Sequence, residues 1–199
     1  MRSAGRTDTI HPHPPTPHSK TPKQLVSNQI KEADAVCFLT NARAGIFMTG
    51  SIGTGLVIAK HNGNWTAPSA IQYVGTGLGF QGGVDLTDYV IILKRQAVDS
   101  FMGNAQLVLG GDAGMSFGLG RHGSAELHLG KGTAVAFGWA ASKGLYAGAA
   151  GTAGILRTRW GANKKFYGRE VSPADILGGK MARPRAARPL YDALNELGI

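Results

Sequence analysis

A run of seven residues near the C-terminus has the composition of an anion-binding surface. Residues 163–169 read Asn-Lys-Lys-Phe-Tyr-Gly-Arg, so Lys164, Lys165 and Arg169 surround the adjacent rings of Phe166 and Tyr167. Cations clamp phosphate oxygens through charge-assisted hydrogen bonds, and aromatic rings can wedge into a lipid headgroup layer. The run therefore predicts a site for anionic lipid. A plainer alternative carries equal weight: both rings pack inward, and the lysines are ordinary solvated charges.

Residues 114–118, Gly-Met-Ser-Phe-Gly, match the nucleophile elbow of serine hydrolases. That chemistry needs a strand before the serine, a helix after it, and then an acid followed by a histidine. Here more glycine-rich sequence follows the motif. The last histidine, His128, precedes the candidate acids Asp175 and Asp192. The order of residues therefore excludes a hydrolase of this type.

Two glycine patterns resemble nucleotide-binding loops. Residues 77–82 and 118–123 both match G-x-G-x-x-G, but each continues into strand-like or glycine-broken sequence. A dinucleotide site needs a helix that opens at the third glycine. Lys131 is followed by glycine instead of serine or threonine, so the chain has no Walker loop around it. The sequence predicts no nucleotide cofactor.

The remaining candidates for catalysis or metal binding have simpler explanations. Asp85 and Asp88 lie close together in the sequence, but capping of a turn is the commoner role for aspartate in such a stretch. His11, His13 and His18 lie among prolines, with no cysteine or carboxylate cluster near them. The sequence therefore predicts neither a metal site nor an enzyme.

The net charge points to a polyanionic partner. The chain of 199 residues carries a formal net charge of +9 at pH 7, and its pI calculated from the sequence is about 9.9. Such a balance suits membrane phospholipid, nucleic acid or an acidic protein surface. No nucleic-acid-reading module is recognisable, so no nucleic-acid partner is expected. The single cysteine, Cys37, excludes an internal disulfide framework, fits a reducing compartment, and is expected to be a buried, inert thiol.

The targeting signals favour a cytoplasmic protein that is peripheral to membranes. No apolar run reaches the roughly 18–20 residues that a membrane-spanning helix needs. The N-terminus has no apolar signal-peptide core. Residues 1–19 contain two arginines and one acid, which leaves a transit peptide open as an alternative.

Composition divides the chain into two parts. Residues 1–22 are rich in proline and predict a disordered arm, and residues 23–199 predict one domain. Within that domain the apolar spacing predicts short helices and many short strands, with Asn62-Gly63 as a hairpin turn. Glycine makes up 30 of the 199 residues, which suggests bulges, coiling or close approach of backbone layers. We therefore expect a β-rich α+β fold: a strongly curved antiparallel sheet or partly closed barrel with short flanking helices over 23–35, 94–102, 172–178 and 189–197.

Several blocks of sequence resemble the SYLF domain family. The most specific are Trp65-Thr-Ala-Pro-Ser-Ala70 and Lys165-Phe-Tyr-Gly168, and further matching blocks lie in the family order from about Ile30 to Leu194. These further blocks are 44–47, 53–55, 86–90, 109–111 and 142–148.

The resemblance implies phosphoinositide and membrane binding, actin association in fungal members, and no known catalysis. Lys164, Lys165, Phe166 and Tyr167 match the family's basic-aromatic block, and Lys143 matches its Ser-Lys-x-Lys-Gly turn in part. We therefore expect a non-catalytic membrane adaptor. The predicted lipid-binding residues are Lys164, Lys165, Phe166, Tyr167, Arg169 and Lys143, with Lys23 and Lys31 assisting. The alternative is a cytoskeletal module that binds acidic actin surfaces.

Overall fold

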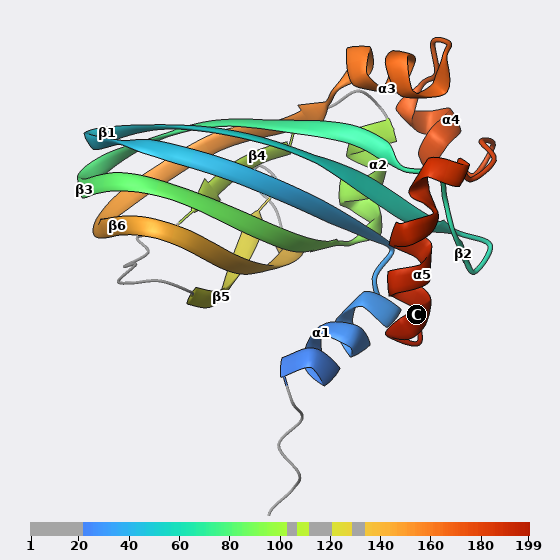
Figure 1. Ribbon diagram of the computed structural model, residues 1–199, viewed down its shortest axis with the longest axis horizontal. Helices are drawn as coiled ribbons and strands as arrows, with labels where there is room; N and C mark the ends of the chain where they lie inside the picture. Colours follow the sequence, from blue (N-terminus) through green and yellow to red (C-terminus); the bar gives the residue numbers. More distant parts are fainter. Residues whose placement is uncertain (1–21, 103–106, 112–120, 129–133) are drawn as a thin grey trace, which may run out of the picture.

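The structure is a computed structural model that describes residues 22–102, 107–111, 121–128 and 134–199. Its helices and strands follow one another along the chain as a β-rich body between short helices (Figure 1). In order they are α1 (Pro22–Lys31), β1 (Ala35–His61), β2 (Asn64–Trp65), β3 (Ser69–Leu93), α2 (Arg95–Met102), β4 (Leu107–Gly111), β5 (Arg121–His128), β6 (Ala134–Thr158), α3 (Trp160–Tyr167), α4 (Pro173–Leu177), the 3₁₀ turn η1 (Arg185–Ala187) and α5 (Arg188–Glu196).

The described strands form one open antiparallel sheet. Its order is β2-β1-β3-β6-β4, and β5 also pairs with β6. Every pairing is antiparallel. The sheet is strongly curved, and its helices are short. The predicted α+β fold with a curved antiparallel sheet is therefore confirmed (Figure 1).

The many short strands expected from the sequence are joined into three long ones, which fold back on themselves. β1 turns sharply at residues 45–48, where Gly45 has φ 149° and Phe47 has φ 60°. The first arm of β1, 35–46, pairs with residues 82–93 of β3, and the second arm pairs with 69–78. Glycines interrupt the apolar pattern without breaking the hydrogen-bonded ladder. That is why one continuous strand reads as several.

Glycine also lets the two arms of β1 lie directly against each other. A Cβ atom at Gly55 would overlap the carbonyl oxygen of Phe38, and one at Gly53 would lie 3.0 Å from the carbonyl oxygen of Thr40. No other residue fits the position of Gly55 without moving backbone, because the obstructing atom is itself backbone. The predicted close approach of backbone layers is confirmed at these glycines.

The predicted hairpin at Asn62-Gly63 is confirmed. The two residues have φ 49° and 77°, and they form a two-residue loop between the pairs Lys60–Trp65 and His61–Asn64. Positive φ at both loop positions is the type I′ geometry that Asn-Gly favours.

Helices cover one end of the folded sheet, which we call the helical end. Between the two arms, α2 and α4 contribute Val98, Phe101, Ile176 and Leu177 to a core that includes Cys37, Leu39, Val57, Ile71 and Ile91. A second cluster joins α1 and α5 to the sheet through Ile30, Val36, Ile58, Trp65, Tyr191 and Leu194. The opposite end, where the strands fold back at residues 41–52 and 74–86, is the tip.

Of the five α-helices in the described residues, four were predicted from sequence and one was missed. α1, α2, α4 and α5 lie within a residue or a few of the expected ranges. The Ser172 hydroxyl accepts a hydrogen bond of 3.0 Å from the Asp175 amide, and Pro173 occupies the first turn, as the cap pattern predicts. α3 was not expected, because it is short and carries no capping side chain at its start.

Candidate anion-binding surface

The inward face of α3 fixes this helix to the start of β3. Asn163 is buried; its Oδ1 accepts a hydrogen bond of 2.7 Å from the Ala70 amide, and its Nδ2 donates one of 3.1 Å to Ser69 Oγ. One helical turn later, the Tyr167 hydroxyl donates a 2.6 Å bond to the carbonyl oxygen of Pro68. Burial raises the pKa of Tyr167 well above its usual value. These two residues therefore hold α3 in place.

The outward face of α3 presents the rest of the predicted basic-aromatic run. Lys164 and Lys165 are exposed, and the Phe166 side chain keeps 48% of its surface accessible. The rings of Phe166 and Tyr167 meet edge to face, with centroids 5.1 Å apart. Each of the two alternatives that the sequence left open is therefore half right: Tyr167 packs inward, whereas Phe166 and the lysines face solvent.

One acidic residue neutralises part of this surface. Lys164 Nζ lies 2.7 Å from Glu170 Oε1, and both side chains are largely exposed. A solvent-exposed ion pair of this kind is worth only about 0–1 kcal/mol. Lys164 can therefore exchange Glu170 for another anion at little cost.

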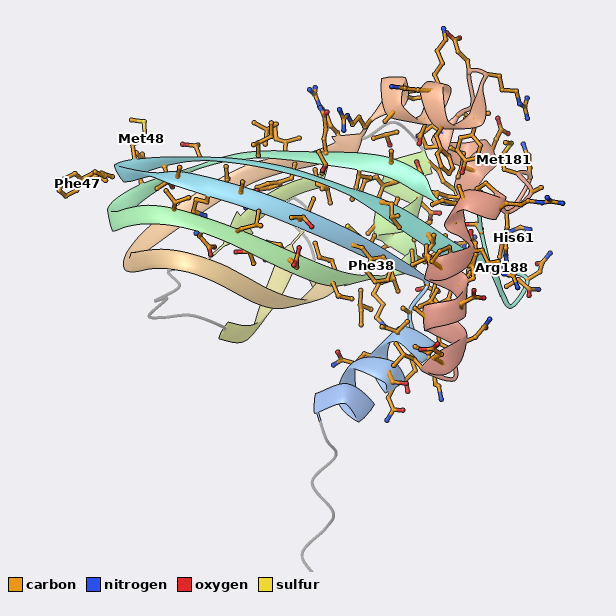
Figure 2. All side chains as sticks on the ribbon, in the orientation of Figure 1. Phe38, Phe47, Met48, His61, Met181 and Arg188 are labelled. Carbon is orange, nitrogen blue, oxygen red and sulfur yellow. The ribbon has the colours of Figure 1, made fainter. Side chains whose placement is uncertain are left out.

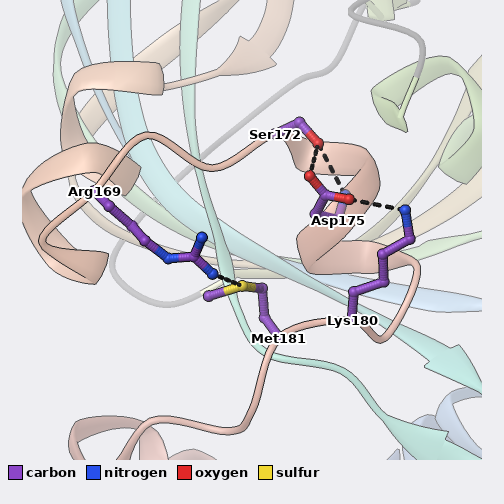
Figure 3. A network of polar contacts seen from close by, with 5 residues as sticks. All are labelled: Arg169, Ser172, Asp175, Lys180 and Met181. Carbon is purple, nitrogen blue, oxygen red and sulfur yellow. Dashed lines mark hydrogen bonds and ion pairs between the residues drawn. The ribbon is translucent and has the colours of Figure 1, made fainter.

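A small polar network holds the loop after α3 (Figure 3). Arg169 is exposed and donates from Nη2 to Met181 Sδ at 3.2 Å. The Asp175 carboxylate accepts bonds from Ser172 Oγ at 2.7 Å and from Lys180 Nζ at 3.0 Å. These bonds, that from Ser172 first, lower the pKa of Asp175. The guanidinium of Arg169 keeps most of its donors for other partners, since sulfur is a weak acceptor.

Three residues adjoin the predicted site that were not part of it. Arg157, Arg159 and Trp160 are all exposed, and Trp160 keeps 48% of its surface accessible. With its amide oriented to satisfy both groups, Gln72 accepts from the Arg157 guanidinium at 2.6 Å. The spacing of Trp160 and Lys164, four residues apart, places them on one helical face. If α3 had been predicted from the sequence, Trp160 would have been assigned to the site together with Lys164.

The other predicted lysines lie on different elements. Lys31 is exposed in the last turn of α1, and α1 lies on the opposite side of the helical end from α3 (Figure 1). Lys23 also belongs to α1, and Lys143 lies in β6 opposite Leu86, with both side chains outside the described part of the structure. The structure brings together Lys164, Lys165, Phe166 and Arg169, and it does not bring Lys31 to them.

α1 packs on the domain as the sequence favoured, rather than standing apart as a membrane-surface helix. Ile30 is buried, and Ser27 Oγ donates a 3.0 Å hydrogen bond to the carbonyl oxygen of Leu197. Lys60 Nζ donates to the carbonyl oxygens of Ile30 and Lys31 at the end of this helix.

In the described residues, none of the catalytic candidates has the arrangement of neighbouring groups that its chemistry requires. Asp85 accepts a hydrogen bond from Thr87, and Asp88 accepts one of 2.6 Å from Thr40. Asp85 and Asp88 are three residues apart on a strand, so they point to opposite faces of the sheet. Residues 77–82 lie within β3, so no helix opens there, and 114–118 fall outside the described residues. Across the described ranges, no group of His, Cys, Asp and Glu could hold a metal ion.

The sequence block from Trp65 to Ala70 acts as an anchor for the C-terminal helices. Besides its bonds to Asn163 and Tyr167, its carbonyl oxygens accept from Arg183 Nε at 2.8 Å and from the Tyr191 hydroxyl at 2.9 Å. The two most specific blocks of the resemblance therefore contact each other. They build the platform that carries the basic surface.

The chain belongs to the Ysc84 (SYLF) family. Its curved sheet carries a basic-aromatic helix that is fixed to a Trp-Thr-Ala-Pro-Ser-Ala anchor. The family model described as "Las17-binding protein actin regulator" matches residues 74–197. LAS seventeen-binding protein 3 of Saccharomyces cerevisiae is 38% identical over 171 residues, covering 84% of this chain and 37% of that protein. SH3 domain-containing YSC84-like protein 1 of Bos taurus is 36% identical over 177 residues, covering 87% of this chain and 52% of that protein.

The chain thus spans 37% to 52% of the length of these curated relatives. Among solved structures, the virulence-associated protein VapD of Rhodococcus equi covers 62% of the chain at 11% identity and a TM-score of 0.39. That similarity is too low to support an inference. None of the helices in the described residues is long and apolar enough to cross a membrane.

Proposed function

We propose that this chain is a non-catalytic adaptor that binds anionic membrane lipid, phosphoinositide in particular, through the outward face of α3. The observation that supports it is the division of labour within α3. Asn163 and Tyr167 attach the helix rigidly, so Lys164, Lys165 and Phe166 are held outward together with Arg169. Each lysine or arginine near an anionic bilayer contributes about 1 kcal/mol, so several must act together.

Lys143 and the α1 lysines, Lys23 and Lys31, have a lesser place in this proposal. Lys31 lies on the other side of the helical end and could meet a second anionic surface, but not the one that α3 faces on a flat bilayer (Figure 1). The five exposed cations between residues 157 and 169 form the principal site.

The test is charge reversal with a matched control. Lys164→Glu with Lys165→Glu should reduce sedimentation with phosphatidylcholine vesicles that contain phosphoinositide to the level seen with phosphatidylcholine alone, and leave the melting temperature unchanged. Arg185→Glu with Arg188→Glu makes the same change in net charge on exposed residues of η1 and α5. Undiminished sedimentation of the lysine variant, or equal loss in both variants, contradicts the assignment.

The alternative function is an actin-cytoskeleton module that binds acidic filament surfaces. It is favoured by the name of the family and that of its yeast member, which mention an actin regulator and Las17 binding. The same basic surface would supply the contact. Co-sedimentation with actin filaments in the absence of lipid, lost in the Lys164→Glu, Lys165→Glu variant, would support this alternative.

A further inference from the structure

The tip of the sheet exposes a cluster of large apolar side chains. Ile46, Phe47 and Met48 follow one another at the corner of β1 and are 72%, 64% and 64% exposed. Figure 2 shows Phe47 and Met48 projecting beyond the end of the ribbon, far from the helices. Water-soluble monomers rarely expose contiguous apolar patches of this kind unless they serve an interaction.

The outer surface behind this corner is also apolar, on both arms of the sheet. Side chains that point outward from β1 and β3 in this region are large, aliphatic and exposed: Ile52, Val74, Leu78, Val84 and Leu86. They pair across the strands, as in Ile52 opposite Val74 and Met48 opposite Leu78. The apolar surface is therefore continuous from one strand to the next.

On β1 and β3, the described side chains that point to the inside of the tip are polar. Asn41, Thr49 and Thr87 alternate with those outward residues and are buried between the arms. Asp85 points to the same side as Thr87, which donates a hydrogen bond to its carboxylate. An antiparallel sheet with one face in water normally turns its apolar face inward and its polar face outward. The tip has the reverse alternation, which suits an apolar medium outside.

A polar belt marks where this inversion ends. Thr40 and Asp88 lie opposite each other on the outer face of one arm, joined by a 2.6 Å hydrogen bond. Thr54 and Gln72 lie opposite each other on the other arm. The two rows are at the same height, because Gly53 lies against the carbonyl oxygen of Thr40. Six residues of strand from Thr40 to Ile46 span about 20 Å, which is more than the roughly 5–10 Å that insertion at the headgroup boundary requires.

The outward-facing surface of the tip carries no charge on β1 and β3, because their two charged residues there, Arg43 and Asp85, lie opposite each other on the inner side. Residues 44–59, 66–84 and 144–156 contain no Asp, Glu, Lys or Arg. Protein interfaces usually have a polar rim with specific hydrogen bonds and charges. A lipid layer makes no such demand, whereas a charge moved into it is costly. Two convex corners of separate copies would also share little surface. The uncharged, convex shape therefore favours lipid over a protein partner.

We propose that the tip inserts into the boundary between the headgroups and acyl chains of a membrane, with Ile46, Phe47 and Met48 deepest. Insertion is shallow, because no described strand pairs with the outer edge of β1 between residues 35 and 59. Unpaired backbone groups are not tolerated in the hydrocarbon core. This contact goes beyond the proposed function: the tip and α3 lie at opposite ends of the molecule, and the tip needs no anionic lipid (Figure 1).

The test places a fluorescent label on the tip. Phe47→Cys labelled with an environment-sensitive dye should shift its emission to the blue with vesicles of phosphatidylcholine alone, and acyl-chain nitroxides should quench it. The same dye at Asp192→Cys, exposed on α5, should not respond. Buried Cys37 will not compete for the label in the folded chain. Equal responses at both positions, or none at residue 47, overturn the proposal.

A variant then measures the contribution of the corner to binding. The triple change Ile46→Ser, Phe47→Asn and Met48→Ser should weaken binding to phosphatidylcholine vesicles at least about tenfold, since each buried apolar side chain contributes strongly. Asparagine accepts the positive φ of position 47, so the turn is kept. Ile46→Leu with Met48→Leu should bind normally.

These variants separate the tip from the basic surface. Lys164→Glu with Lys165→Glu should keep the dye response while losing the dependence on phosphoinositide, so either proposal can fail alone. Sedimentation velocity tests the other possible partner of the corner, which is a second copy of the chain. A dimer that the triple change dissociates, together with unchanged vesicle binding, would show that the corner is a self-association surface and overturn the lipid assignment.

Discussion

The two ends of the folded sheet use the same strands in opposite ways. At the helical end, Leu39, Val57, Ile71 and Ile91 point inward, and α2 and α4 close the space between the arms. At the tip, the inward positions of the same strands are polar, and the outward positions are large and apolar. The hydrogen-bonded ladder runs through both ends, continuously between β3 and β6 and with one register shift at Ile46–Met48 between β1 and β3.

This difference shows that the ladder does not decide which face of the sheet is buried. Backbone hydrogen bonds hold both ends, but the helices supply an apolar partner at one end alone. Glycine allows the arms to touch at Gly53 and Gly55, which leaves little room for large side chains between them beyond the helices. The large side chains of the tip are therefore outside.

The largest expected effect is a contrast between phenylalanines at the two ends. Phe101 is completely buried in the core, and Phe47 is exposed at the corner. Phe101→Ala should cost about 3–5 kcal/mol of unfolding free energy because it leaves a cavity. Phe47→Ala should cost less than about 0.5 kcal/mol. Urea unfolding of the two variants measures both values, and similar losses would remove the distinction between the ends.

A second contrast uses two buried asparagines. Asn163→Ala removes both bonds that attach α3 and leaves the Ala70 amide without its acceptor, so it should cost about 2 kcal/mol. Asn41 lies inside the tip, and its Oδ1 has no partner among the described residues. Asn41→Ala should cost less than half as much. Chemical denaturation gives the comparison. A larger loss for Asn41→Ala would mean that the interior of the tip is more tightly organised than its contacts indicate.

The pH dependence of the unfolding free energy at alkaline pH should report the burial of Cys37 at the helical end. Cys37 is fully buried there, and burial raises the pKa of its thiol far above the ordinary 9.0. The thiol is therefore protonated in the folded chain, while the unfolded chain loses the proton above about pH 9. Stability should be unaffected below that pH and should fall above it by about 1.4 kcal/mol per pH unit from this group. The difference in slope between the chain and Cys37→Ala, from denaturation at pH 8 to 10.5, isolates the thiol.

The smallest expected effect concerns the acidic neighbour of the basic surface. Glu170→Gln removes the partner of Lys164, so binding to vesicles with phosphoinositide should tighten by less than about fivefold. The dye response of the tip to phosphatidylcholine should not change. Weaker binding after this change would show that Glu170 positions Lys164 instead of competing for it.

Local patterns in the sequence predicted much of the framework. The Asn62-Gly63 hairpin, the Ser172 cap and the amphipathic spacing of α5 depend on residues only a few positions apart. The glycine content predicted close contact of backbone layers. It did not predict that β1 turns back on itself at Gly45–Met48. The long strands were mistaken for short ones, because interruption by glycine looks the same in a sequence whether a strand ends or bends.

The site was predicted in composition but not in arrangement. The run from Lys164 to Arg169 was recognised, yet the sequence could not assign Tyr167 to the inside and Phe166 to the outside. Their orientation follows from partners at Pro68–Ala70, which are 93 to 99 residues away in the chain. No pattern within the run contains that information.

By itself, the sequence determined the family, the β-rich class, the turn and cap positions, and a concentration of positive charge near the C-terminus. Tertiary structure alone decided which side chains of α3 face solvent, and that the sheet has a polar interior and an apolar exterior at its tip. The physical reason is range. Turns and caps are set by neighbouring residues, whereas the burial of a strand face depends on whatever distant segment packs against it.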